Sequence, residues 1–195
     1  MNYNKTVTAL GNVDIYIIDQ ILKNRYVPTD TILDAGCGEG RNLKWFYNNN
    51  YNISGIDTDY NRIQVAKLKY PEAADNFSIG NLEDLPYSDN QFNHVICNAA
   101  LHFASNKQEC LNMFSELVRV LKPNGTLFIR MASDIGLLDA PYVKDGKTAQ
   151  ISSFYLTRDF IKTLLKNYSI TLIEPVKTTN VADKRAMTTL VFCKL

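Results

Sequence analysis

The sequence lacks the features that mark several large classes of protein. Lysine and arginine (21 residues) nearly balance aspartate and glutamate (20 residues), so the net charge is only +1 at pH 7. Because nucleic-acid binding usually needs a basic face, no nucleic-acid partner is expected. No apolar run approaches the roughly 18 residues of a membrane span, and the first ten residues have no signal-peptide core. We therefore expect the protein to be cytoplasmic and to make no contact with a membrane.

Cysteine is also scarce, and its spacing is uninformative for metal binding. The four cysteines lie far apart and form no pair of the kind that ligates zinc: Cys37, Cys97, Cys110 and Cys193. Such spacing predicts neither a disulfide scaffold nor a metal site, and reduced thiols are the expectation.

The chain length suits one domain with a sizeable core, so residues 1–195 are interpreted as a single domain. Apolar residues recur at helical spacing from Val13 to Lys23, which predicts an amphipathic helix within an N-terminal flank or lid, residues 1–30. Residues 132–152 break the periodicity, as long irregular segments near functional sites often do. This segment is expected either to cover an acceptor pocket or to form a mobile surface loop.

Glycine is concentrated in one turn, between an apolar run and a segment with helical character. Asp34 ends the run, and Gly36, Gly38 and Gly40 follow at alternate positions. Glycine accepts positive φ and has no Cβ, so the backbone N–H groups of such a turn can lie against a ligand. A dinucleotide-binding turn would need its third glycine at position 41, which is Arg41. A nicotinamide-dependent oxidoreductase is therefore disfavoured.

The D-x-G-x-G-x-G pattern from Asp34 to Gly40 resembles motif I of the class I S-adenosylmethionine (SAM)-dependent methyltransferases, which include the type 11/25-like small-molecule methyltransferases. Asp57 follows Gly36 by 21 residues and ends the strand expected over Asn52–Asp57, and Asp59 is expected to cap a helix over Tyr60–Lys69. A carboxylate offers two acceptor oxygens and no donor. The resemblance accordingly implies that Asp57 binds the two ribose hydroxyls of the cofactor.

Residues 80–103 resemble the next two motifs of the same family, with two departures. Asn81 stands where the family often has aspartate against the adenine, and Asn93 stands where aspartate usually follows Phe92. Neither change removes hydrogen-bonding capacity. The N–H of Leu82 is the candidate donor to an adenine ring nitrogen. No Asn/Asp-Pro-Pro-Tyr/Phe sequence follows the fourth strand, so methylation of adenine or glutamine amino groups is disfavoured.

The resemblance implies a SAM site, with S-adenosylhomocysteine (SAH) as the product. Its expected residues are Asp34, Gly36, Cys37, Gly38, Gly40, Asn42, Asp57, Thr58, Asn81, Leu82 and Asn98. Candidate acceptor contacts are Arg130, Tyr142 and Tyr155. His102 is a candidate general base, although a histidine between Leu101 and Phe103 often only packs or caps.

Strands alternate with helices along most of the chain, which predicts an α/β fold with a doubly wound, Rossmann-like, mostly parallel sheet. Expected later elements are a helix over Gln108–Leu121, a turn at residues 122–125, a strand over Thr126–Met131, a helix over Arg158–Lys166 capped by Thr157, and strands over Ser169–Val176 and Met187–Lys194. The link between the last two strands is too short for a parallel crossover, so the seventh and last strand is expected to be antiparallel.

The leading hypothesis is transfer of a methyl group from SAM to a small-molecule acceptor, by a monomer or homodimer. A SAM- or SAH-binding module without turnover is the alternative from a different class, because fold and motif do not establish chemistry. An RNA methyltransferase is the further alternative if Arg62, Lys67 and Lys69 belong to a basic patch.

Overall fold

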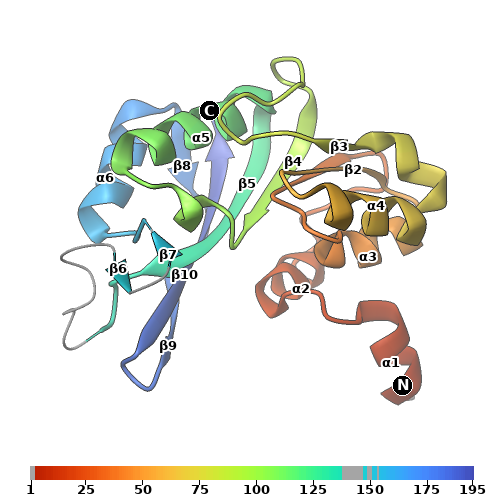
Figure 1. Ribbon diagram of the computed structural model, residues 1–195, viewed down its shortest axis with the longest axis horizontal. Coiled ribbons are helices and arrows are strands. Elements are labelled where there is room, and N and C mark those ends of the chain that lie inside the picture. Colours follow the sequence, from red (N-terminus) through yellow and green to blue (C-terminus); the bar gives the residue numbers. More distant parts are fainter. Residues whose placement is uncertain (1–2, 138–146, 149–150, 153) are drawn as a thin grey trace.

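The fold is a twisted sheet covered by helices on both faces (Figure 1). The computed structural model describes residues 3–137, 147–148, 151–152 and 154–195. The strand order in the main sheet is β3-β2-β1-β4-β5-β10-β8, and β9 pairs with β10. The strands are β1 (Thr31–Ala35), β2 (Asn52–Asp57), β3 (Phe77–Ile79), β4 (Phe92–Asn98), β5 (Leu121–Ser133), β8 (Ile170–Leu172), β9 (Lys177–Val181) and β10 (Arg185–Lys194). A separate antiparallel pair joins β6 (Lys147–Thr148) to β7 (Ile151–Ser152).

The direction of the strands confirms the expected mixed α/β sheet with its last strand reversed. Strands β3, β2, β1, β4 and β5 run parallel, whereas β10 is antiparallel to β5, β8 and β9. The expected count of seven strands is wrong, because the sheet has eight. The additional strand is β9, in the segment taken as a link, whose residues KTTNV are only partly buried and show no apolar alternation.

Helices form one layer on each face of the sheet. They are α1 (Tyr3–Leu10), α2 (Ile15–Leu22), α3 (Lys44–Asn48), α4 (Tyr60–Lys69), α5 (Lys107–Val120) and α6 (Arg158–Asn167), with short 3-10 turns η1 (Arg41–Leu43), η2 (Pro71–Asn76) and η3 (Leu101–Phe103). Apolar residues of α5 and α6 form one buried cluster with the sheet, and those of α2, α3 and α4 form a second cluster on the other face. A parallel sheet buried on both faces explains the nearly continuous apolar runs of its central strands.

Side-chain caps fix where several helices begin. Asp59 accepts hydrogen bonds from the N–H groups of Asn61 and Arg62 at the start of α4, as expected. Thr157 caps α6 by accepting from the Phe160 N–H at 3.0 Å, also as expected. Helix α5 begins one residue earlier than expected, because Asn106 is its N-cap.

Strand β5 differs from the expected turn followed by a strand. The segment interpreted as a turn, residues 122–125, lies inside β5, and the pairing with β4 shifts between Phe92 and His94. Asn124 adopts a φ of 63° there. The local sequence thus makes a bulge in a continuous strand rather than a separate turn.

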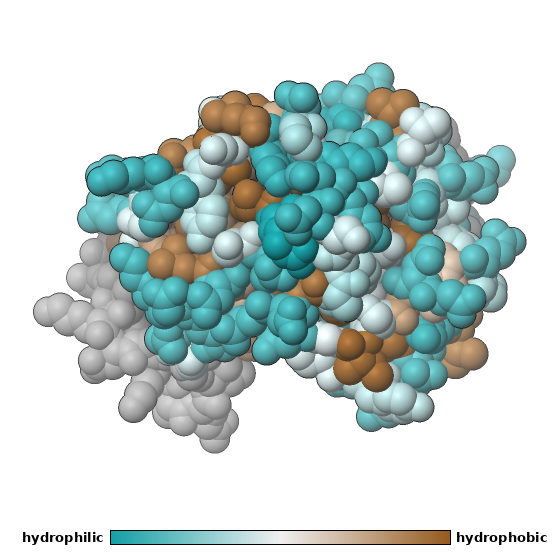
Figure 2. Space-filling model, turned by 90° about the horizontal axis from the view of Figure 1, so that it is seen from above, coloured by the Kyte–Doolittle hydropathy of each residue, from teal (hydrophilic) through white to brown (hydrophobic). Residues whose placement is uncertain are grey.

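The surface seen from above in the view of Figure 1 is mainly hydrophilic. Strands β4 and β5 start on this side, and its apolar side chains are scattered in small groups (Figure 2). In the part of the chain that the structure describes, no helix is long and apolar enough to cross a membrane. The large apolar side chains are concentrated instead in the two layers against the sheet.

Candidate functional site

The glycine turn after β1 has a backbone shape that other residues rarely adopt. Gly36, Gly38 and Gly40 have φ values of 77°, 54° and 73°, in the left-handed region. The N–H groups of Gly36 and Cys37 both donate to the Ile56 carbonyl, at 2.8 and 3.0 Å. A Cβ on Gly36 would lie 2.4 Å from the Ala100 Cβ. The turn is therefore held against the end of β2 and against the loop that follows β4.

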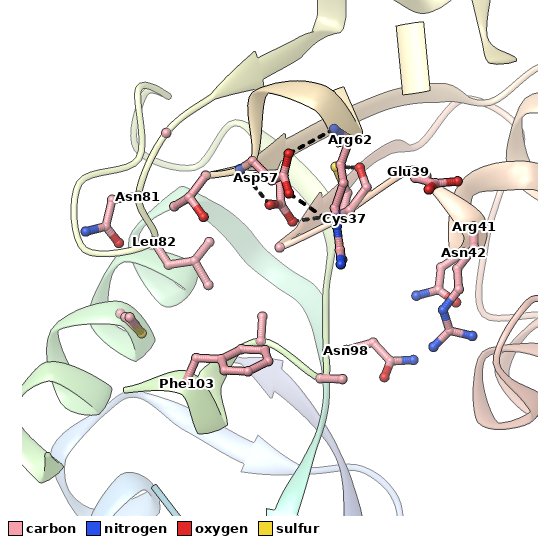
Figure 3. A pocket seen from close by; sticks show the side chains of 18 of the residues that line it. Cys37, Glu39, Arg41, Asn42, Asp57, Arg62, Asn81, Leu82, Asn98 and Phe103 are labelled. Atoms are coloured by element: carbon pink, nitrogen blue, oxygen red, sulfur yellow. Dashed lines mark hydrogen bonds and ion pairs between the residues drawn. The ribbon is translucent and has the colours of Figure 1, made fainter. Parts of the chain in front are cut away.

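Asp57, the last residue of β2, holds this turn through its carboxylate. Its Oδ2 accepts the Gly38 N–H at 2.7 Å, and its Oδ1 accepts the Asp59 N–H at 3.0 Å. Each carboxylate oxygen can accept more than one hydrogen bond. Asp57 can thus shape the turn and still present acceptors to a ligand in the adjoining cavity (Figure 3).

A cavity of about 700 Å³ opens over the glycine turn. In Figure 3, Asn81 and Leu82 lie on one side of it and Arg41 and Asn42 on the opposite side, with Asp57 between them. Asn98 and Phe103 lie across the cavity from Asp57. The volume suits a cofactor or drug-sized ligand, for which pockets of about 300–1,000 Å³ are usual. The cavity sits at the carboxyl ends of β1, β2 and β4, where open α/β sheets bind ligands.

Most of the expected cofactor residues come together around this cavity. Those that line it are Gly36, Cys37, Gly38, Asn42, Asp57, Thr58, Asn81, Leu82 and Asn98. Asp34 and Gly40 are not among its described lining residues. Gly40 supports the turn from behind, where its carbonyl accepts the Tyr70 hydroxyl at 2.7 Å.

Other lining residues were not among the expected cofactor residues. They are Asn12, Glu39, Arg41, Asp59, Arg62, Lys69, Gly80, Ala99, Ala100, Phe103 and Met113. Glu39 and Arg41 lie within the glycine-rich segment and could have been included from their position. Asn12 belongs to the link between α1 and α2, and no local pattern marks it.

Asp34 is completely buried beside the cavity, and both of its carboxylate oxygens lack a hydrogen-bond partner in the described structure. Burial raises the pKa of this carboxyl to about 7; the nearby Arg41 opposes this shift and Asp57 adds to it. An unsatisfied buried carboxyl is costly unless a donor or a positive charge approaches it. Its position therefore suits a ligand that carries positive charge.

Cys37 is buried near Asp34. Its side chain is 6% exposed, and burial raises the pKa of the thiol above its usual range, with smaller contributions from Asp34 and Asp57. The neutral thiol is a small packing group rather than a nucleophile. Within the described residues, no cluster of histidine, cysteine or acidic side chains could hold a metal ion.

His102, the candidate general base, lies in η3 just before Phe103 and is not one of the described cavity-lining residues. Its Nδ1 atom is buried and has no hydrogen-bond partner among the described residues. Burial lowers the pKa of His102, and Arg185 lowers it further. The other histidine, His94, is structural, because it contacts Asp30 at 2.9 Å and Thr126 at 2.6 Å.

Of the three residues expected to contact the acceptor, the structure describes Arg130 and Tyr155. Arg130, on β5, lies 3.4 Å from the Asp14 carboxylate and over the Tyr16 ring, 5.3 Å from its centroid. Tyr155 belongs to a segment tied to the end of β5 by the Leu156 N–H, which donates to the Ala132 carbonyl at 2.9 Å. Tyr142 lies outside the described residues.

The doubly wound sheet and the glycine-turn cavity define a Rossmann-like nucleotide-binding α/β protein. A family model described as "Methyltransferase domain" matches residues 33–129. The chain is 30% identical over 104 residues to malonyl-[acyl-carrier protein] O-methyltransferase from Enterobacter lignolyticus, covering 53% of this chain and 39% of that protein. The chain belongs to the class I SAM-dependent methyltransferase family. It spans about two fifths of the length of the first curated relatives that it matches.

Solved structures share the fold at low sequence identity. A SAM-dependent methyltransferase from Methanosarcina mazei superposes with a TM-score of 0.72 at 20% identity, covering 90% of this chain and 97% of that one. Magnesium protoporphyrin IX methyltransferase from Synechocystis, solved with bound SAH, superposes with a TM-score of 0.72 at 18% identity. The match covers 100% of this chain and 89% of that one. At such identities the likeness shows the fold alone.

Proposed function

We propose that this protein transfers a methyl group from SAM to a small-molecule acceptor. The observation that carries the proposal is the contact between the Asp57 carboxylate and the Gly38 N–H at the wall of one cavity, which supports Asp57 as the acceptor for ribose hydroxyls beside the glycine turn. The unpartnered atoms of Asp34 and Asn98 add buried polar groups beside that cavity. SAM carries a sulfonium and an ammonium, so the buried Asp34 carboxyl fits its charge.

The chain's own residues would bind and orient the cofactor. Asp57 would accept the two ribose hydroxyls, and Asn81 with the Leu82 N–H would bind the adenine edge. Asn81 Oδ1 accepts the Glu83 N–H at 3.2 Å, which orients this side chain. SAM supplies a methyl group on a positively charged sulfur, which is already a good electrophile. The protein's main task is then to align the acceptor and to exclude water.

His102 is the residue we propose as proton acceptor where the methyl acceptor must lose a proton. Its buried Nδ1 has no partner among the described residues, and its lowered pKa keeps the imidazole neutral near pH 7, as a base requires. Replacing His102 by Gln should lower kcat while leaving SAH affinity unchanged. Equal losses of kcat and of SAH affinity would indicate that His102 only packs.

A small acceptor is favoured over RNA by the surroundings of two of the three basic residues considered above, Arg62 and Lys69. Arg62 lies 3.5 Å from Asp59, and Lys69 lies 2.6 Å from Glu39. All four of these residues line the cofactor cavity rather than a separate basic stripe. Their charges are thus largely balanced locally.

The test is calorimetric titration with SAM and with SAH, on the wild type and on Asp57→Ala. Micromolar binding that is lost in Asp57→Ala would support the site. Asp75→Ala is the matched control, because Asp75 is an exposed aspartate on η2 away from the cavity. Absence of binding by both ligands would overturn the proposal.

Turnover is then assayed with labelled SAM and a panel of small acceptors. Transfer that depends on Asp57 supports an enzyme. Tight SAH binding without transfer to any acceptor class would favour the non-catalytic binding module instead.

A further inference from the structure

A row of buried polar side chains without partners crosses the sheet next to the cofactor cavity. Asn98 on β4 pairs in register with Arg130 on β5, and Arg130 pairs with Thr189 on β10. Both polar atoms of the Asn98 side chain, Arg130 Nε and Thr189 Oγ1 are buried without a hydrogen-bond partner among the described residues. Asn98 and Thr189 are 6% and 3% exposed. Such groups cost free energy unless a ligand satisfies them.

These three side chains lie on the same face of the sheet. Residues two apart in a strand point to the same face, and each member of the row stands two residues from a core residue packed in the α2, α3 and α4 layer. Those core residues are Ile96, Phe128 and Val191. Neighbouring strands are about 4.8 Å apart, so the row spans about 10 Å from the cavity wall toward β10.

Arg130 is held so that one edge of its guanidinium stays free. Its Nη1 faces the Asp14 carboxylate at 3.4 Å, and its Cζ lies over the Tyr16 ring, 5.3 Å from the centroid. Tyr16 is itself fixed by a 2.6 Å hydrogen bond between its hydroxyl and Thr179 Oγ1 on β9. Asp14 is shared with Arg41, whose Nη2 lies 3.8 Å away. The Nε edge of Arg130 is therefore oriented but unused.

We propose that Asn98, Arg130 and Thr189 form a binding subsite for a carboxylate of the methyl acceptor. A carboxylate accepts from the fork of an arginine and from adjacent amide and hydroxyl donors, which are the three donor types in this row. Arg130 has only the Asp14 carboxylate as an ion-pair partner among the described residues, and it shares that partner with Arg41. The inference rests on the proposed methyl transfer and adds the chemical class of the acceptor.

The methionine carboxylate of the cofactor is the other source of the same chemistry. Arg130 and Thr189 are not among the described residues that line the cofactor cavity, whereas Arg41 is. The row shares only Asn98 with that cavity. The subsite would thus extend from the cavity wall at Asn98 toward α2 and β9, which hold Tyr16 and Thr179.

The test uses ligand-observed NMR on protein saturated with SAH. The probes are matched carboxylates and amides: benzoate with benzamide, phenylacetate with phenylacetamide, and hexanoate with hexanamide. At least one carboxylate should bind roughly tenfold more tightly than its amide, as expected for a charge-assisted contact. Arg130→Met should abolish this preference, and Arg130→Lys, which keeps the charge but not the fork, should restore only part of it. Arg158→Met, at an exposed arginine of α6, is the control.

Thr189→Val should weaken carboxylate binding severalfold, whereas Thr188→Val should not. Thr188 is the adjacent residue but bonds Ser133 and Thr178 on the opposite face of the sheet. Thermal unfolding of each variant checks that it is folded.

Three outcomes would overturn the subsite: no preference for any carboxylate, a preference that survives Arg130→Met, or a tenfold loss of SAH affinity in Arg130→Met. The last outcome would assign Arg130 to the cofactor's own carboxylate. Failure of SAH to bind the wild type is scored separately, because it overturns the proposed function itself.

Discussion

The Asp57 carboxylate and the Gly38 N–H are joined by a 2.7 Å hydrogen bond, so the residue that ends β2 also shapes the turn that follows β1. This contact ties two segments 19 residues apart into one wall of the cavity. Asp57 therefore has two roles, in the stability of the turn and in the binding of a ligand. Variants at this position should separate them.

Asp57→Asn should weaken SAH binding by about tenfold or more while lowering the free energy of unfolding by only about 1 kcal/mol. The amide keeps one oxygen that can accept from Gly38, but its NH₂ group replaces an acceptor for ribose. Calorimetry and urea unfolding measure the two effects. Asp75→Asn is the control, and an unchanged SAH affinity in Asp57→Asn would contradict the ribose assignment.

Gly36→Ala should destabilise the fold by at least about 2 kcal/mol, as judged by urea unfolding. The added Cβ would meet the Ala100 Cβ at 2.4 Å, and the φ of 77° is unfavourable for alanine. The double variant Gly36→Ala/Ala100→Gly should recover the part caused by the clash but not the part caused by φ.

Gly38→Ala separates the cost of a positive φ from the cost of the clash. The φ of Gly38 is also positive, at 54°, but the nearest atom to its added Cβ is in the Arg62 side chain, at 3.5 Å. It should be less destabilising than Gly36→Ala. An equal decrease in the free energy of unfolding in the two variants would show that the close approach of the added Cβ to Ala100 does not contribute to the destabilisation.

Asp34→Asn should make the ligand-free protein more stable at pH 7.5 than the wild type, with the difference shrinking toward pH 4. Burial raises the pKa of Asp34 to about 7 in the folded protein, against about 3.9 in the unfolded chain. Between these values the folded state binds the additional proton, so the Asp34 contribution to stability falls as pH rises. The full effect of this shift on the free energy of unfolding is on the order of 4 kcal/mol.

Urea unfolding of wild type and Asp34→Asn at several pH values measures this difference. SAM should remove the advantage of the variant, because a cationic ligand favours the ionised carboxylate. A difference that does not change between pH 4 and 7.5 would contradict the raised pKa.

His94 should contribute a pH dependence of the opposite sign. Its pKa is lowered, chiefly by burial, against a partly compensating hydrogen bond to Asp30. The unfolded chain then binds a proton before the folded state does, so stability should fall as pH drops below about 6.5. His94→Gln should reduce this fall when unfolding is compared at pH 7.5 and 5.5.

His102→Gln is the companion variant, because His94 and His102 are the only histidines and the pKa of His102 is also lowered. When the free energy of unfolding is plotted against pH, the double variant should lose the part of the slope that depends on histidine. A slope that is the same in the wild type and the double variant would contradict both lowered pKa values.

The sequence predicted elements best where the determinants are local. Strand β2 and helix α4 have the expected bounds because Asp57 ends one and Asp59 caps the other. The sequence could not predict the bulge in β5, because it depends on pairing with β4. Strand β9 was missed because its partly exposed residues carry no apolar alternation and it pairs only with β10.

The site shows the same division between local and long-range determinants. Gly36, Gly38 and Asp57 were expected at one site because the motif marks them, and they line one cavity; their contact with the cofactor stays a prediction. Asp34 was expected to contact the cofactor but is fully buried, and its depth depends on how α2, α3 and α4 cover β1. Asn12 reaches the cavity only through the path of the chain between α1 and α2, which no motif encodes.

The position of β10 has a consequence for how the chain folds. Strand β10 lies between β5 and β8, so the sheet is interrupted until residues 185–194 have been synthesised. During translation, β5 would present an unpaired edge, which is a template for aggregation. Folding of this half of the sheet must therefore wait for β10, and until then the edge of β5 is open to pairing with other chains.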